Sequence, residues 1–139
     1  MELAAILTEY GRRYGLEHLT LDDAGRCALS LDREAVLLID HRPASRAVFL
    51  RVPFALPPLA GPEERAVLYR RLLRANLLGE ETGGAVFSVD LDEEHLELHR
   101  RVPLDTRIET RDFADRVDAL YGTARHFAAE LGLAFDTGE

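Results

Sequence analysis

The sequence holds one cysteine, no tryptophan and no apolar run near the roughly 20 residues needed to cross a bilayer. A lone Cys27 cannot form a disulfide within the chain, so nothing indicates an oxidising compartment. Residues 1–5 have neither the basic start nor the apolar stretch of a signal peptide. These absences predict a cytoplasmic location and no membrane partner.

Positive charge is also scarce. The chain has 17 Lys and Arg against 25 Asp and Glu, a formal charge of -8, and a surface of this sign repels phosphate backbones. Two basic groups, Arg100 with Arg101 and Arg70 with Arg71 and Arg74, are interpreted as solvated faces of a strand and a helix. We therefore expect no nucleic-acid partner.

Signatures of catalysis and metal binding are missing as well. His95 and His99 have an HxxxH spacing, but on a strand their side chains would lie about 13 Å apart, too far for one zinc ion. The acidic run at 90–94 lacks the glycine of a calcium loop, and the glycine pair 83–84 lacks the GK[ST] of a phosphate loop. Cys27 is interpreted as an inert core thiol. We expect no enzyme, no catalytic residue, no metal ligand and no cofactor.

A length of 139 residues suits one domain, 1–139, with a core of its own. Apolar spacing predicts three helices: one ending at Gly15, one from Pro62 to about Leu78 capped by Gly79, and one from a Thr110 N-cap to Gly132.

Alternating and continuous apolar runs predict five strands, at 26–32, 35–39, 47–52, 85–91 and 95–102. The second is expected to be covered on both faces or central in the sheet, and Pro53 to end the third before a loop at 54–61. The order helix-β-β-β-helix-β-β-helix favours an α+β fold, a twisted and mainly antiparallel sheet with helices packed on it.

The second predicted helix is apolar over an arc of roughly 200°, wider than one sheet can cover. Its surplus face would pack on a copy of itself, or else be covered by the loop at 54–59. We predict a homodimer in which Asn76 helps to fix the register. The predicted interface comprises Leu68, Tyr69, Leu72, Leu73, Asn76 and Leu77.

Residues 72–79 have the sequence LLRANLLG, residues 83–89 GGAVFSV, and residues 96–104 LELHRRVPL, before an amphipathic last helix. This series resembles the class I type III secretion chaperones, the Tir-chaperone-like family, with their LLxxNLLG, a strand opened by two glycines and a strand ending in RRxPL. The resemblance covers nearly the whole chain, although the Pro-rich loop at 53–62 departs from it.

The resemblance implies a homodimer in the bacterial cytosol that binds the N-terminal segment of a secreted effector protein. It further implies that the effector stays soluble and is presented to the export machinery, including its ATPase. We expect the extended segment to cross the first helix and first three strands, where an open sheet edge offers unpaired backbone groups. The expected groove residues, each with a core position as the alternative, are Leu3, Leu7, Leu29, Leu31 and Phe49.

Two other functions suit the same fold class. One is a small regulatory protein-binding module, and the other is a ligand-binding α+β domain, both unrelated to secretion. A concave pocket with convergent polar groups would favour the ligand-binding domain.

Overall fold

The computed structural model describes residues 2–16, 19–58, 61–90, 95–104 and 107–138. Its elements follow the predicted α+β order, with one short strand added near the C-terminus. They are α1 (Leu3–Arg13), β1 (Arg26–Leu31), β2 (Ala35–Arg42), β3 (Ala47–Ala55), α2 (Pro62–Ala75), β4 (Val86–Asp90), β5 (His95–Pro103), α3 (Thr110–Leu131) and β6 (Ala134–Phe135). The predicted turn at 92–94 lies outside the described residues.

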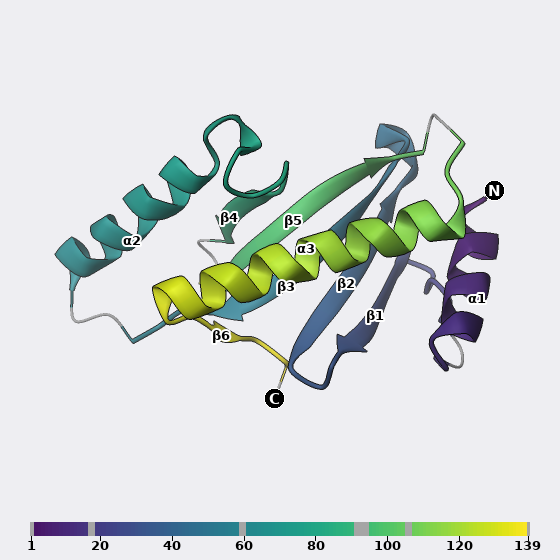
Figure 1. Ribbon diagram of the computed structural model, residues 1–139, viewed down its shortest axis with the longest axis horizontal. Helices are drawn as coiled ribbons and strands as arrows, with labels where there is room; N and C mark the ends of the chain where they lie inside the picture. The colour runs from purple at the N-terminus through teal and green to yellow at the C-terminus, as the bar shows by residue number, and fades with distance from the viewer. Residues whose placement is uncertain (1, 17–18, 59–60, 91–94, 105–106, 139) are drawn as a thin grey trace.

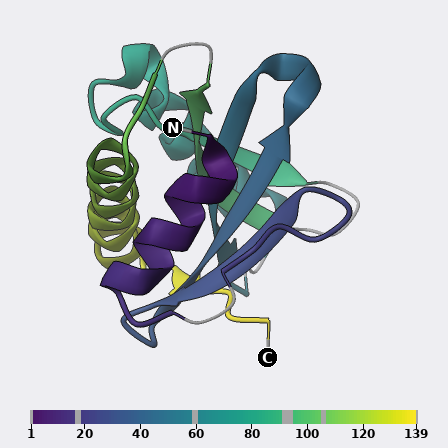
Figure 2. The ribbon, with the colours of Figure 1, turned by 90° about the vertical axis from the view of Figure 1, so that its right-hand side faces the viewer.

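The strands form an antiparallel sheet in the order β1-β2-β3-β5-β4, and β6 pairs with the end of β3. Helix α3 crosses one face of this sheet diagonally, and α1 packs beside its N-terminal half (Figure 1). Figure 2 shows both helices on the same side of the strands. Helix α2 stands at the β4 end, away from the other two, so much of its surface is left uncovered.

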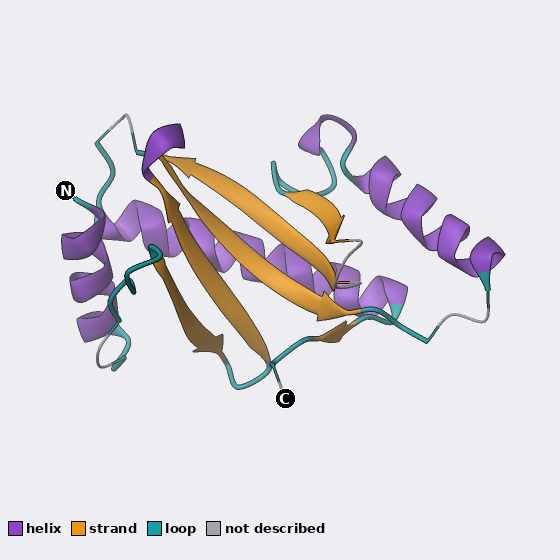
Figure 3. Cartoon of the chain, turned by 180° about the vertical axis from the view of Figure 1, so that it is seen from behind, coloured by secondary structure: helices purple, strands orange, loops and turns teal. Residues whose placement is uncertain are grey.

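The core lies between the sheet and α3. Side chains of a strand alternate between faces, so every second residue of β2, β3 and β5 points toward the helix. Leu37, Leu50 and Leu98 are fully buried in this way, as are Phe113 and Phe127 of α3. The other face of the sheet, turned toward the viewer in Figure 3, carries no described helix. We call it the open face.

The open face rules out one of the two alternatives predicted for the second strand, a cover on both faces. β2 is an interior strand, but Val36 and Leu38 are half-buried because helices cover one face of it and not the other. An uninterrupted apolar run therefore marks apolar positions on both faces here, and the outward-facing ones remain accessible.

Pro53 does not end the third strand, which continues to Ala55. Backbone N and O of one residue point toward the same neighbouring strand, and the carbonyl of Pro53 accepts a hydrogen bond from the amide of Asp136, at 3.1 Å. The pairing of β2 with β3 extends as far as Arg51, so the proline nitrogen costs no bond to β2. Phe54 belongs to the core, and the predicted loop at 54–61 starts later.

Helix ends also differ from prediction at two places. Helix α2 ends at Ala75, three residues early, because Leu78 takes a left-handed φ of 56° that no α-helix allows. Helix α3 is capped by Glu109 rather than Thr110, through a reciprocal bond with Asp112. Gly132, at φ 66°, ends α3 as predicted.

Candidate functional site

Exposed apolar side chains gather in α2, the turn after it and β4. The turn is a 3-10 helix, η2 (Leu77–Gly79). Leu73 and Leu77, one helical turn apart, are 70% and 66% exposed. A surface of this kind in a small domain marks a protein interface. We call it the α2–β4 surface, and its members are Leu73, Leu77, Leu78 and Val86.

The structure divides the predicted interface residues into two groups. Leu72 is buried in the core of the chain, and Leu68 and Tyr69 are partly buried against that core. Leu73 and Leu77 offer their apolar surface to solvent. The over-wide arc predicted for α2 is thus present, with half of it used inside the chain and half exposed. Whether a second copy covers the exposed half stays a prediction.

Asn76 has a different place from the one expected for it. Its side-chain amide donates to the carbonyl of Phe87 at 3.0 Å, and its side-chain oxygen accepts from the amide of Phe87 at 2.7 Å. These two bonds take the place of the two that a residue of a neighbouring strand would make with the outer edge of β4. The side chain is therefore already paired within the chain, where it fixes the end of α2 against β4.

Replacing Asn76 by Ala is expected to lower the free energy of unfolding by about 2 kcal/mol, because two hydrogen bonds are lost and the Phe87 backbone groups are left unpaired. Urea denaturation followed by circular dichroism measures this. The matched control is Arg70→Ala, an exposed position on the same helix. Equal stability of the two variants would show that the Asn76 bonds do not hold α2.

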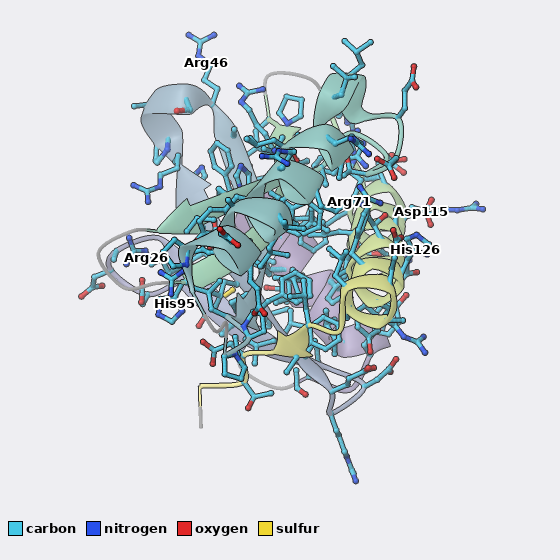
Figure 4. The ribbon with its side chains drawn as sticks, turned by 90° about the vertical axis from the view of Figure 1, so that its left-hand side faces the viewer. Arg26, Arg46, Arg71, His95, Asp115 and His126 are labelled. Atoms are coloured by element: carbon cyan, nitrogen blue, oxygen red, sulfur yellow. The ribbon has the colours of Figure 1, made fainter. Side chains whose placement is uncertain are left out.

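Arg71 corrects the prediction of a solvated arginine face on this helix. Its guanidinium donates to Glu130 at 2.7 Å and to Glu81 at 2.9 Å, and it lies 5.6 Å from the ring centre of Phe127. Figure 4 shows Arg71 and His126 on the α3 side of the molecule, opposite Arg26 and His95. Arg71 thus ties α2 to α3, whereas Arg70 and Arg74 are exposed as predicted.

Each row of residues across the strands of the open face mixes apolar and charged side chains. Leu38 pairs with Arg51, which pairs with His99; Asp40 pairs with Phe49 in the next row. A hollow of 470 Å³ lies on this face, with Val36, Leu38 and Pro53 among its lining residues. This shallow, mixed surface suits a peptide segment better than a fully enclosed small molecule.

Of the five predicted groove residues, Phe49 lies on the open face, half-buried and 6.2 Å from the His99 ring. Leu3 and Leu7 of α1 and Leu29 and Leu31 of β1 belong to the core. The alternative, a core position, therefore holds for these four residues, and their side chains pack on the covered side of α1 and β1. A role in binding a segment along β1 stays a prediction.

A polar network runs along the open face of β5. Arg51 donates to both oxygens of Glu97, at 2.8 to 3.1 Å, and His99 lies 3.3 Å from the Ser88 hydroxyl and 3.6 Å from Glu97. Burial lowers the pKa of His99; Glu97 opposes this shift and Arg51 adds to it. A neutral His99 is therefore favoured in the folded chain.

The free energy of unfolding should fall on acidification because of His99. Its folded-state pKa lies below the ordinary 6.5, so the unfolded chain takes up the proton more readily and the stability present above that pH is lost below it. We expect His99→Gln to lose less stability than the wild type between pH 7.5 and 5.5 in urea denaturation. Exposed His126→Gln is the control, and an unchanged acid loss in His99→Gln would contradict the assignment.

The remaining reactive side chains show no assembled chemistry. Burial, with a smaller contribution from Asp22, raises the pKa of the Cys27 thiol to about 11, which favours the unreactive protonated form. His95 and His99 lie on a strand, as predicted, where i and i+4 side chains are far apart. Across the described ranges, no group of three or more His, Cys, Asp or Glu could hold a metal ion.

None of the helices that the structure describes is long and apolar enough to span a membrane. Exposed apolar side chains on α2 and in the turn after it, a sheet face without a described helix and a shallow mixed hollow are together typical of a protein-binding α+β domain.

Comparison with known proteins gives the family. The model of the Tir chaperone protein (CesT) family matches residues 5–128. A Chlamydia pneumoniae protein, CPj0713/CpB0740, is 31% identical over 116 residues, which are 83% of this chain and 84% of that protein. The chain belongs to the Tir chaperone protein (CesT) family.

Solved structures share the fold. A chain of the ExsC–ExsE complex superposes with a TM-score of 0.75 at 18% identity, covering 91% of this chain and 94% of that one. A chain of the HopA1–SchA chaperone–effector complex has a TM-score of 0.68 at 17% identity, covering 88% and 89%. At these identities the likeness concerns the fold.

Sequence reasoning missed the charged residues of the open face. Asp40, Arg51 and Glu97 come from three different strands, and each sits in an otherwise apolar or mixed run. The alternation of side chains along each strand places the three residues on one face. Their contacts, however, depend on the strand order, in which β5 lies between β3 and β4.

Proposed function

We propose that this protein is a dimeric cytosolic chaperone that binds the N-terminal segment of a type III secreted effector and keeps it soluble and competent for secretion. The observation that carries the proposal is the pair of unpartnered surfaces, on α2 with β4 and on the open face, in a chain of the CesT family. The role is one of binding and not of catalysis.

The two surfaces have different partners in this proposal. Leu73 on α2 and Leu77 in the turn η2 form an exposed apolar pair, and α2 stands away from the sheet, which suits contact with the same pair of a second copy. A C2 dimer would leave the open face and the β1 edge of each copy accessible, so one effector segment could engage both copies.

The effector segment would bind in extended form along β1 and onto the open face. β1 stands at the end of the strand order, where an added strand can pair with its backbone. Phe49 and Leu38 then offer half-buried apolar contacts to alternate side chains of the segment. One solved structure of the same fold is described as a chaperone–effector complex, which supports this kind of partner.

Hydrogen exchange on the chaperone with and without its client tests this arrangement. We expect protection in β1 and in β2 and β3, and loss of that protection when the N-terminal segment of the client is deleted. Deletion of the client's folded domains is the control and should leave protection unchanged. Protection confined to α2 or to residues 133–138 would contradict the proposed site.

A further inference from the structure

One carboxylate on the open face is shared by three arginines. Asp40 is 3% exposed, and its Oδ2 lies 3.0 Å from Arg42 and 3.6 Å from both Arg26 and Arg51. Its other oxygen, Oδ1, is buried and has no hydrogen-bond partner among the described residues. The cluster thus brings three cations to one oxygen atom and leaves the second without a donor.

This arrangement differs from the structural ion pair beside it. Arg51 and Glu97 form a bidentate pair in which both carboxylate oxygens accept, the geometry expected when two residues satisfy each other. Arg26 and Arg42 add charge to Asp40 without such pairing, and their side chains are 56% and 53% exposed. Most of their N–H donors therefore remain accessible to another anion.

The hollow around Asp40 and Phe49 is locally cationic on a chain whose formal charge is -8. Three arginines meet two carboxylates in its lining, a surplus of one positive charge. An acidic segment would be repelled by most of the molecule and attracted here, and such a field selects both partner and orientation. The residues counted are Arg26, Arg42 and Arg51 against Asp40 and Glu97.

The C-terminal tail of the chain shows how an acidic extended segment fits beside this face. Phe135 in β6 stacks on Phe54 at 5.2 Å between ring centres, while the next residue, Asp136, lies 3.3 Å from His95. An apolar side chain thus enters the core and its acidic neighbour meets a basic group of the open face. The hollow around Asp40 and Phe49, of 370 Å³, offers the same combination further along the sheet.

We propose that Arg26 and Arg42 form an anion-binding subsite for an acidic residue of the client, set beside an aliphatic residue that packs on Phe49 and Leu38. This inference rests on the proposed function and adds to it the chemistry of the recognised segment. The chaperone selects a segment in which Asp or Glu neighbours an apolar residue, and the Asp40 cluster holds the two arginines in position for its carboxylate.

Fluorescence anisotropy with labelled peptides of repeating Ser-Glu-Leu, Ser-Gln-Leu and Ser-Lys-Leu tests the subsite on the full chain. The wild type should bind the Glu peptide up to about fivefold more tightly than the Gln peptide, and the Lys peptide more weakly still. The preference should disappear at high ionic strength, where charges are screened beyond about 3 Å in 1 M salt. Equal affinity for the three peptides would overturn the proposal without any variant.

A double variant, Arg26→Gln with Arg42→Gln, should lose the preference for the Glu peptide, and Arg26→Lys with Arg42→Lys should keep most of it. The matched control is Arg12→Gln with Arg111→Gln, two exposed helix positions that change the net charge equally. If the two Gln double variants bind the Glu peptide alike, the subsite is wrong. Binding of the wild type to anionic vesicles instead of to the Glu peptide would assign the cluster to a membrane and overturn the proposal.

Capture of the natural client separates this inference from the function on which it rests. If the wild type and the Arg26→Gln, Arg42→Gln variant retain a secreted client equally well, the subsite is wrong and the chaperone role stands. If the wild type retains no secreted client, the chaperone role fails and the subsite with it.

Discussion

Replacing Leu73 and Leu77 together by Asp is expected to convert a particle of about 31 kDa, twice the chain mass of 15.6 kDa, into a monomer. Both side chains are largely exposed in the single chain, so the fold itself should tolerate the change. In a dimer the same positions would bury two carboxylates per copy against each other, at a cost of several kcal/mol. Light scattering across a dilution series measures the mass.

The control adds the same charge elsewhere. Ala119→Asp with Ala129→Asp changes two exposed positions on α3 and should leave the mass at that of a dimer. A wild-type mass near 15.6 kDa at working concentration would contradict the dimer, and dissociation of the control would show that added charge alone causes the effect.

Replacing Phe127 by Ala is expected to lower the free energy of unfolding by about 3–5 kcal/mol, a large share of the 5–15 kcal/mol typical of a domain. Phe127 is fully buried, meets Phe87 edge-to-face at 5.0 Å and lies under Arg71. Its loss leaves a cavity between α3 and β4 and removes a contact that holds α2. Guanidinium denaturation followed by circular dichroism gives the change.

Phe127→Leu is the matched variant, because it retains an apolar side chain and should lose less than half as much stability. Tyr14→Ala, at an exposed aromatic position, should lose little. Equal losses in all three variants would contradict the placement of Phe127 in the core between α3 and β4.

Periodic apolar residues made much of the fold predictable. Phe113, Val117 and Phe127 lie on one stripe of α3, and period-two alternation in β1 and β5 gives the buried side correctly. Such signals are local, because the apolar residues of a single helix or strand show which of its faces must be buried. The exposed stripe of α2 followed from the same reasoning, because its apolar arc exceeds what one sheet can cover.

Features that depend on tertiary neighbours were not predictable. β6 has two residues, too few for any alternation, and it forms because Phe135 reaches Phe54 after α3 has ended. Pro53 was expected to stop a strand, but β2 no longer pairs with β3 at its position. The bonds of Asn76 to Phe87 join two different elements, so the sequence does not show them. Without them, the position of Asn76 in the apolar arc of the predicted helix indicates a dimer interface.

The candidate site was predicted unevenly for the same reason. Leu73 and Leu77 could be recognised from one helix, whereas the charge cluster of the open face needed the register of β1 against β2 and of β2 against β3. Four of the predicted groove residues are core residues instead: Leu3 and Leu7 lie on the buried side of α1, and Leu29 and Leu31 lie on the covered face of β1.

Affinity capture from the native cytosol, followed by mass spectrometry, tests the chaperone role most directly. The wild type should retain a secreted effector in a complex containing two copies of this chain, and the Ala119→Asp, Ala129→Asp control should retain it equally. Deleting the N-terminal segment of that effector should abolish its retention, and deleting its folded domains should not. The account would be contradicted if the effector were still retained without its N-terminal segment, or if the captured proteins included no secreted protein.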